Sequence, residues 1–319
     1  MNRNVPIAVV VLIVIALIAA VVYAQVSLPG SSSTKTEATS SNPGSVIQVV
    51  AAENFWGSLV SQLGGAHVHV LSIVSDPNTD PHQYESNTAT AQAISNASLV
   101  IVNGAGYDQW ALALISASNN PHQTVLNVQN VLGLQSGVNP HFWYSPYYVN
   151  DTVKAMYKNL VSIDTADSAY YRQQYASLNS SLWTYMSREV EIRQQFAGTV
   201  VASTESIFQY MANATGLNLV SPPAFMEAVA EGNDPPAQSV VQFQQQLQSD
   251  NGTYVKVLVY NQQTVTPLTQ STKSIASQEG IPILGVTETV QPPDVTFQVW
   301  MSTELLSLQN ALNANALGK

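Results

Sequence analysis

The chain has 319 residues, of which 9% are charged, and a net charge of −10 at pH 7. An acidic chain of this kind is unsuited to binding nucleic acid but favourable for binding cations. The chain contains no cysteine, which excludes disulfides, iron–sulfur clusters, thiolate zinc sites and a cysteine nucleophile. Its hydrophobic share of 45% is typical of globular proteins, and its length allows two domains with a core of ordinary size.

The first 45 residues predict a targeting segment followed by a tether. Residues 1–24 include a long run of uncharged, mostly aliphatic residues, enough to span a bilayer as a helix. This segment is either an uncleaved membrane anchor or a signal peptide, and Ala24 offers a small residue for cleavage. Residues 25–45 are rich in Ser and Thr, which predicts a flexible linker. Both alternatives place the rest of the chain outside the cytoplasm.

Residues 46–165 alternate between strand and helix patterns. Such β-α-β alternation predicts an α/β lobe with a largely parallel sheet, because parallel neighbours are joined by crossover helices. The expected strands are 46–52, 67–74 and 99–102, and the expected helices are 53–63, 88–97, 107–115 and 151–163.

Residues 166–196 predict a linking segment that consists almost wholly of one long helix, 168–196. Apolar and aromatic residues recur in that helix at steps of three and four, and its 29 residues extend roughly 43 Å. The helix belongs either to one domain or, as its length equally suggests, to two lobes that share it. Residues 197–319 then form a second α/β lobe. Its expected strands are 198–202, 217–220, 255–260 and 281–286, and its expected helices are 205–213, 235–249, 266–279 and 294–312.

Two Pro-His steps provide candidate ligands. His82 follows a Pro-rich loop after the strand 67–74, and His141 lies 59 residues further along in a second such step. Ligands bind at the carboxyl ends of strands in open α/β sheets, so the two imidazoles are candidates to converge on one point. The alternative is that both are ordinary histidines on surface loops, because a short motif alone has low specificity.

Two carboxylates of the second lobe complete the candidate site. Glu205 and Glu288 each come two or three residues after an expected strand. Two neutral imidazoles and two carboxylates suit a divalent transition metal, whose charge the carboxylates balance. The sequence therefore predicts a metal site formed by His82, His141, Glu205 and Glu288 in a cleft between the two lobes.

Six short stretches share their residues, order and spacing with one known family. They are 64–70 (GGAHVHV), 80–85 (DPHQYE), 103–110 (NGAGYDQW), 139–143 (NPHFW), 203–210 (STESIFQY) and 286–288 (VTE). Taken together, these stretches resemble the metal-binding solute-binding proteins of manganese, zinc and iron ABC transporters. That family has two α/β lobes bridged by one long helix, and it captures metal outside the cytoplasm for delivery to a membrane permease. The resemblance implies the same fold, function and permease partner here.

The resemblance also implies a role for each candidate ligand. His82 and His141 stand at the two histidine positions of the first lobe. Glu205 stands at the third position, as in manganese-type members, where zinc-type members usually have histidine. Glu288 replaces the usual aspartate, so Asp294 is an alternative fourth ligand. We expect Glu85 to line the cleft or to orient a ligand.

The cargo follows from the chemistry of the ligands. Four ligands that each bind through one atom make a tetrahedral site suited to zinc, whereas carboxylates that bind through both oxygens suit manganese or iron(II). Manganese or iron is the favoured cargo, with zinc next. A closed shell of four protein ligands favours binding over catalysis, so we expect no enzyme activity. We also expect the protein to be a monomer. The alternatives are a metal-dependent hydrolase that uses the same cleft and a surface adhesin.

Overall fold

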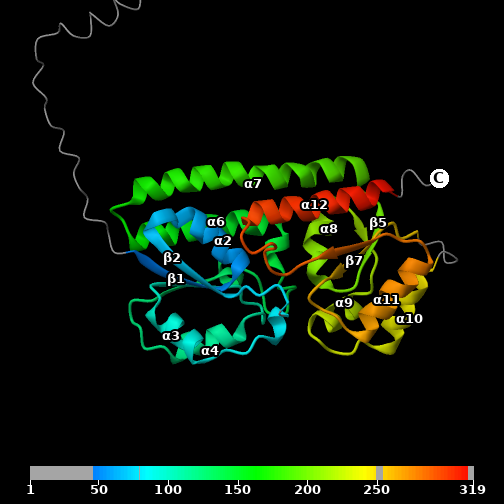
Figure 1. Cartoon of the computed structure of the whole chain (residues 1–319), viewed down its shortest axis with the longest axis horizontal. Helices are drawn as coiled ribbons and strands as arrows, with labels where there is room; N and C mark the ends of the chain where they lie inside the picture. The colour runs from blue at the N-terminus through cyan, green and yellow to red at the C-terminus, as the bar shows by residue number, and fades with distance from the viewer. Residues whose placement is uncertain (1–45, 79, 249–253, 315–319) are drawn as a thin grey trace, which may run out of the picture. The chain divides into compact units, whose positions relative to one another are not determined.

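Two parallel sheets form the framework of the protein. The computed structural model describes residues 46–78, 80–248 and 254–314. Within them, one four-stranded sheet has the order β2-β1-β3-β4 and the other has the order β6-β5-β7-β8, with every neighbouring pair parallel (Figure 1). The strands are β1 (Ile47–Glu53), β2 (Val68–Val74), β3 (Leu99–Val102), β4 (Thr124–Asn127), β5 (Val200–Ser203), β6 (Asn218–Leu219), β7 (Leu258–Asn261) and β8 (Ile283–Val286).

Helices cover both faces of the first sheet. Alternate residues of β1 and β3 point to opposite faces, so Val49 and Leu99 join one core cluster whereas Val50 and Val100 join another. The helices α2 and α6 pack on the first face, and α3 and α4 on the second (Figure 1). A strand buried on both faces reads as a continuous apolar run, which is why β3 was predictable from LVIV.

The described helices differ from the expected ones mainly at their ends. The α/β fold and its parallel sheets are confirmed, but the strand β4 and the helices α5 and α9 were not expected. The helices are α2 (Asn54–Gly64), α3 (Thr88–Asn96), α4 (Gln109–Ala117), α5 (Val128–Val131), α6 (Pro146–Ile163), α7 (Ser168–Phe196), α8 (Gln209–Thr215), α9 (Pro223–Ala230), α10 (Ala237–Leu247), α11 (Pro267–Gln278) and α12 (Phe297–Ala314). Four short 3₁₀ turns are η1 (Gly65–His67), η2 (Pro81–Gln83), η3 (Phe142–Tyr144) and η4 (Ser206–Phe208).

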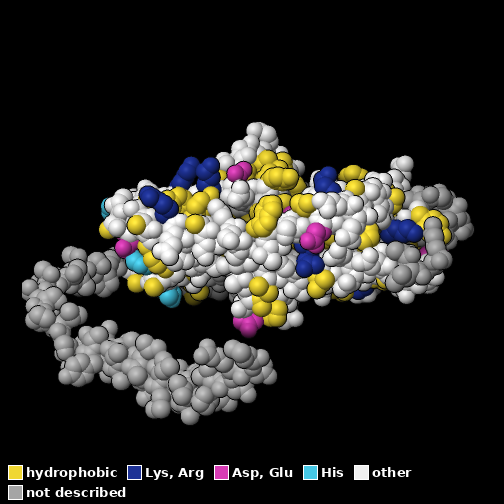
Figure 2. Space-filling view, turned by 90° about the horizontal axis from the view of Figure 1, so that it is seen from above, with side chains coloured by type: hydrophobic (Ala, Val, Ile, Leu, Met, Phe, Trp, Pro, Cys, Tyr) yellow, Lys and Arg dark blue, Asp and Glu magenta, His cyan; other side chains and the backbone are white. Residues whose placement is uncertain are grey.

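The helix α7 joins the two halves of the fold. It packs on α2 and α6 next to the first sheet, and on α8 and α12 next to the second (Figure 1). Its buried residues, among them Leu178, Leu182 and Tyr185, follow a helical stripe that faces this core. The shared helix expected from its length is therefore present. Uncharged side chains dominate the surface seen from above, on the side of α7 (Figure 2).

Both sheets have the same topological switch point. The first strand of each sheet, β1 or β5, lies between the second and the third strand, so the chain leaves it in opposite directions. A crevice forms at the carboxyl ends of the strands at such a point, and ligands bind there. Glu53 and Asn261 end β1 and β7, whereas Asn103 and Glu205 follow β3 and β5 closely. The topology thus brings polar residues to the two switch points.

The expected anchor or signal peptide (1–24) and the linker (25–45) lie outside the described residues. Among the helices of the part that is described, none combines the length and the apolar character needed to cross a membrane.

Candidate metal site

His82 lies on the turn η2, which its neighbour Asp80 holds in place. The Asp80 carboxylate accepts the backbone N–H of His82 at 3.0 Å and the Gln83 side-chain amide at 3.0 Å. Pro81 is buried, which fixes the turn against the first lobe. The His82 side chain is 16% exposed, and its Nε2 has no hydrogen-bond partner among the described residues. This nitrogen is therefore free to bind a ligand.

His141 is fully buried, and Asn139 orients it. The Asn139 amide donates to the Ser206 carbonyl at 2.7 Å and to Gln209 Oε1 at 3.0 Å, so its oxygen points to His141. That oxygen lies 2.6 Å from His141 Nδ1, which must carry the proton. The lone pair is then on Nε2, which is buried and has no partner among the described residues.

The pKa of His141 is lowered well below its usual value. Burial is the main cause, and the neighbouring His82 adds to it. A neutral imidazole is the form that binds a metal. His141 is thus held in the required protonation state and orientation.

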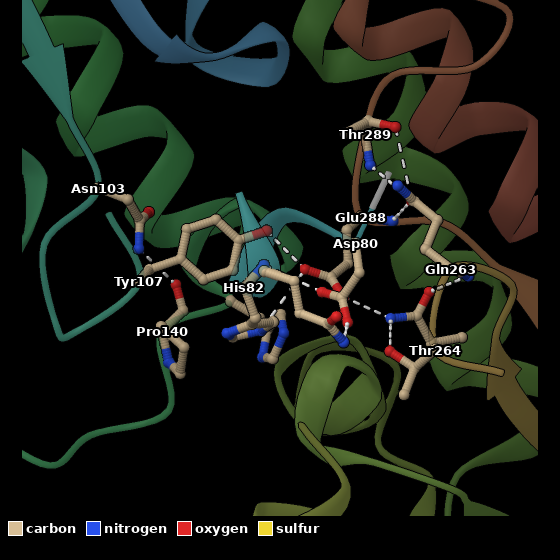
Figure 3. Close-up of polar contacts among 12 residues, drawn as sticks. Asp80, His82, Asn103, Tyr107, Pro140, Gln263, Thr264, Glu288 and Thr289 are labelled. Carbon is tan, nitrogen blue, oxygen red and sulfur yellow. Dashed lines mark hydrogen bonds and ion pairs between the residues drawn. The ribbon is translucent and has the colours of Figure 1, made fainter. Parts of the chain in front are cut away.

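Glu288 reaches the histidines from the second lobe. Its Oε2 lies 3.6 Å from His82 Nε2, and it accepts the Tyr107 hydroxyl at 2.5 Å (Figure 3). Its Oε1 accepts the side-chain amide of Asn261. Burial raises the pKa of the Glu288 carboxyl, while the charge of His82 and the hydrogen bond from Tyr107 lower it. The carboxylate is therefore held from both lobes.

Three of the four predicted ligands converge. One donor atom each from His82, His141 and Glu288 lies within 4.8 Å of the other two. Glu205 is fully buried, but it does not belong to that group of three. Asp294, the alternative fourth ligand, is exposed and outside the group.

Glu205 lies next to the group. Neither of its carboxylate oxygens makes a well-aligned hydrogen bond among the described residues, and the side chains of Asn261 and Thr264 are the polar donors nearest to the carboxyl. Burial raises the pKa of Glu205 well above its usual value, the charge of Glu288 raises it further, and Asn261 and Thr264 act in the opposite direction. Buried polar groups are normally hydrogen-bonded, so a carboxyl of this kind indicates that a ligand is accommodated here.

One expectation about supporting residues was wrong. Glu85 is exposed and does not line the cavity at His82. Asn139 orients a histidine instead. The sequence signal for this was its place directly before the second Pro-His step.

A buried network behind the site was missed by the sequence reasoning. Asp108 accepts the backbone N–H groups of Asn103 and Gly104 at 2.5 and 2.8 Å, and burial raises its pKa to about 6. The Asn103 amide donates to the Pro140 carbonyl at 2.9 Å, which ties this turn to the loop of His141 (Figure 3). Burial and then Asp108 raise the pKa of Glu53 well above its usual value.

A second network joins the two lobes next to the site. The Glu304 carboxylate accepts the Tyr144 hydroxyl at 2.6 Å and the backbone N–H of Thr287 at 2.9 Å. Tyr144 lies on η3 just after His141, and Thr287 directly precedes Glu288. The network therefore fixes the distance between the loops that carry two of the candidate ligands.

A cavity leads to the site from the side of α9. It has a volume of about 320 Å³. Its lining includes His82 and Tyr107 from the first lobe, Glu227 from α9 and Glu231 directly after α9. A small cation has access to His82 through this cavity, past two carboxylates.

A second His/Asp group differs from the first in that its histidine is paired with a carboxylate at hydrogen-bond distance. It comprises His67, Asp164 and Asp167 at the start of α7. His67 Nδ1 is 2.8 Å from an Asp167 oxygen, and the Tyr171 hydroxyl donates to Asp164 at 2.9 Å. These contacts connect η1 to the start of α7, which is a structural role.

Comparison with known proteins identifies the family. The family model described as ZnuA, zinc-uptake complex component A, periplasmic, matches residues 49–311. The chain belongs to this family. The resemblance found in the sequence motifs is thereby confirmed.

Individual relatives of the ZnuA family match more distantly. Over 188 residues the chain is 27% identical to the manganese-binding lipoprotein MntA of Halalkalibacterium halodurans. The matched region covers 56% of this chain and 61% of MntA. The chain spans 58–61% of the length of the curated relatives that it matches.

Solved structures share the fold over their whole length. A crystal structure of ZnuA has a TM-score of 0.66 at 21% identity and covers 85% of this chain and 99% of the other. The periplasmic zinc-binding protein TroA from Treponema pallidum has a TM-score of 0.70 at 16% identity. The match covers 84% of this chain and 99% of TroA. The two-lobed arrangement is therefore that of this family.

Proposed function

We propose that this protein captures a divalent transition metal outside the cytoplasm and delivers it to the permease of an ABC transporter. The observation that carries the proposal is the convergence of His82, His141 and Glu288, with two unpartnered imidazole nitrogens facing a carboxylate. Glu205 is the proposed fourth ligand, because its carboxyl is buried beside Glu288 and makes no well-aligned hydrogen bond among the described residues. The family description, a periplasmic component of a zinc-uptake complex, supports this function.

Binding rather than catalysis is the better fit to these residues. A hydrolytic metal site keeps an open position for water and has a general base nearby. Here the four proposed ligands come from both lobes and enclose the ion. The hydrolase alternative therefore has less support, and the adhesin alternative gains none from the residues of the site.

The proposed cargo is manganese or iron(II), with zinc next. Affinity alone follows the Irving–Williams order and favours zinc over manganese, so selectivity must come from geometry and ligand type. Two carboxylates offer more oxygen donors than a zinc site needs. The relative MntA is described as manganese-binding and TroA as zinc-binding, so both metals have precedents among similar proteins.

The proposed organisation follows the two sheets. The first lobe comprises residues 46–165, the linking helix 166–196 and the second lobe 197–319. The protein acts as a monomer, without nucleic acid and without enzyme activity. Residues 1–24 anchor it to the membrane or direct its secretion, and residues 25–45 link this segment to the lobes.

Elemental analysis after competition among metals tests the function. The purified protein is exposed to equal concentrations of manganese, iron(II) and zinc, and is expected to retain about one ion per chain. The variants His82→Ala and His141→Ala are expected to lose tight binding, by a factor above about 100, while remaining folded, because each removes one nitrogen ligand. His122→Ala is the control, since His122 lies on an exposed loop. Wild-type affinity in either variant, or metal-dependent hydrolysis in a substrate screen, would contradict the proposal.

A further inference from the structure

Tyr107 crosses from one lobe to the other at the candidate metal site. It lies in the turn after β3 and is only 4% exposed. Its hydroxyl donates to Glu288 Oε2, on a residue 181 positions later in the chain, at 2.5 Å (Figure 3). Its ring centroid is 4.7 Å from that of His82 and 6.1 Å from that of His141. The ring therefore contacts the imidazoles while the hydroxyl holds the opposing carboxylate.

Two donors on opposite sides fix the rotation of the Glu288 carboxylate. Asn261 donates to Oε1 from the second lobe, and Tyr107 donates to Oε2 from the first. Gln263 also accepts the backbone N–H of Glu288 at 2.7 Å. Of the two oxygens, Oε2 is the one recorded near His82 Nε2. The carboxylate therefore presents one oxygen to the histidines and turns the other toward Asn261.

We propose that Tyr107 is a positioning residue: by holding Oε2 while Asn261 holds Oε1, it stops the Glu288 carboxylate from rotating to present both oxygens to the metal, and so sets the metal preference of the site. This inference rests on the proposed metal-binding function. A carboxylate that binds through one oxygen keeps the coordination number low, which suits zinc, whereas one that binds through both oxygens raises it and suits manganese. The Tyr107 hydroxyl thus moderates the preference for manganese that two glutamates would otherwise create.

Removal of this hydroxyl alone tests the proposal. Tyr107→Phe keeps the ring against both histidines but frees one side of the carboxylate. Dissociation constants for Mn²⁺ and Zn²⁺ are measured in one buffer, and X-ray absorption on the manganese-loaded protein counts the nearest oxygen and nitrogen atoms. The ratio of manganese to zinc affinity is expected to rise about tenfold, the scale of a hydrogen bond to a charged group. The number of nearest light atoms is expected to rise by one.

Tyr84→Phe is the matched control. The Tyr84 hydroxyl is hydrogen-bonded to Thr90 Oγ1 at 2.9 Å in the same lobe, and none of its recorded contacts is with a proposed ligand. This variant is expected to leave the affinity ratio and the number of neighbours unchanged. Thermal unfolding of all three metal-free proteins verifies that each is folded.

Two results would overturn the inference. An equal loss of affinity for both metals, with an unchanged number of neighbours, would mean that Tyr107 only supports the local structure. An unchanged ratio would mean that the hydroxyl does not restrict Glu288. If the wild-type protein bound neither metal, the proposed function itself would fail, and that failure is visible before any variant is made.

Discussion

Asn139 determines which nitrogen of His141 is available, and substitution at this position tests that role. Asn139→Ala removes the oxygen that accepts from Nδ1, so the ring is free to rotate or change tautomer. Loss of such a supporting contact typically lowers metal affinity 10–100-fold. Calorimetric titration with Zn²⁺ and Mn²⁺ is expected to show a loss of this size for both metals.

Asn139→Asp provides the comparison for that variant. An aspartate keeps an oxygen for Nδ1 but loses the donor to the Ser206 carbonyl. Its metal affinity is expected to lie much closer to that of the wild type. If both variants lost affinity equally, the contact with Ser206 rather than the histidine tautomer would be the property that matters.

Glu205 is the proposed ligand that lies outside the group of three. If it binds the metal, Glu205→His adds a third nitrogen and removes a carboxylate, which favours zinc. The ratio of zinc to manganese affinity, measured by competition, is expected to rise at least tenfold. An unchanged ratio would show that Glu205 does not contact the metal.

Local motifs in the sequence mark the candidate ligands. His82 and His141 each follow a proline, and Glu205 and Glu288 each follow a strand, so their positions were readable without distances. Tyr107 was part of a recognised motif, but its partner Glu288 is 181 residues away. No periodicity or spacing encodes a contact of that kind. The same holds for Asn261, whose role depends on the packing of β7 beside β8.

At the scale of elements, the turn after β3 has to adopt unusual backbone angles to bring Tyr107 to the site. Gly104, Ala105 and Gly106 all have positive φ, at 78°, 54° and 86°. Asp108 closes the turn by accepting two backbone N–H groups. The position of Tyr107 therefore depends on a left-handed turn, which the two glycines adopt readily and Ala105 adopts at an energetic cost.

Gly104→Ala is expected to destabilise this turn. A Cβ there would lie 2.7 Å from Asn127 Oδ1, in addition to the cost of a left-handed alanine. The free energy of unfolding is expected to fall by about 2–3 kcal/mol, which urea denaturation measures. Gly106→Ala is the control, because a Cβ at Gly106 meets nothing within 4 Å. That variant is expected to lose only about 1 kcal/mol, and equal losses would contradict the steric argument.

Elements with strong patterns were predicted better than short ones. The helix α7 has the expected bounds of 168–196, because its apolar stripe continues over the whole length. The edge strand β4 has four residues, of which only Leu126 is buried, so it has no clear apolar run. Pairing with β3 stabilises β4, and that is a tertiary effect which local sequence does not report.

At the scale of the whole molecule, several carboxyl groups are buried, and they make stability depend on pH. Burial raises the pKa of Asp108 to about 6, of Glu304 to about 7 and of Glu189 to about 8. Each group has a higher pKa in the folded than in the unfolded chain. At pH values between its unfolded and its folded pKa, the folded chain therefore binds more protons than the unfolded chain. Stability is therefore highest below the unfolded pKa, near 4, and falls as pH rises through the folded pKa.

Glu189 loses its proton at a higher pH than Asp108 and Glu304. It lies on the buried stripe of α7 and is 4% exposed, and burial alone raises its pKa. At pH 7 Asp108 has lost most of its proton and Glu304 about half of its own, whereas Glu189 is still mostly protonated. Stability that depends on protonated Glu189 is still being lost between pH 7 and 8.

Glu189→Gln is therefore expected to flatten the pH dependence between pH 7 and 8. A full proton difference changes stability by 1.36 kcal/mol per pH unit, so the wild-type protein should lose about 1 kcal/mol more than the variant across this interval. Urea unfolding of the metal-free protein with a chelator, at both pH values, measures the difference.

Glu191→Gln is the matched control, because Glu191 is exposed on the same helix. The control should follow the wild-type slope, since an exposed glutamate is solvated in both states. Parallel slopes for the wild type and Glu189→Gln would show that the Glu189 carboxyl is already ionised in the folded protein at pH 7.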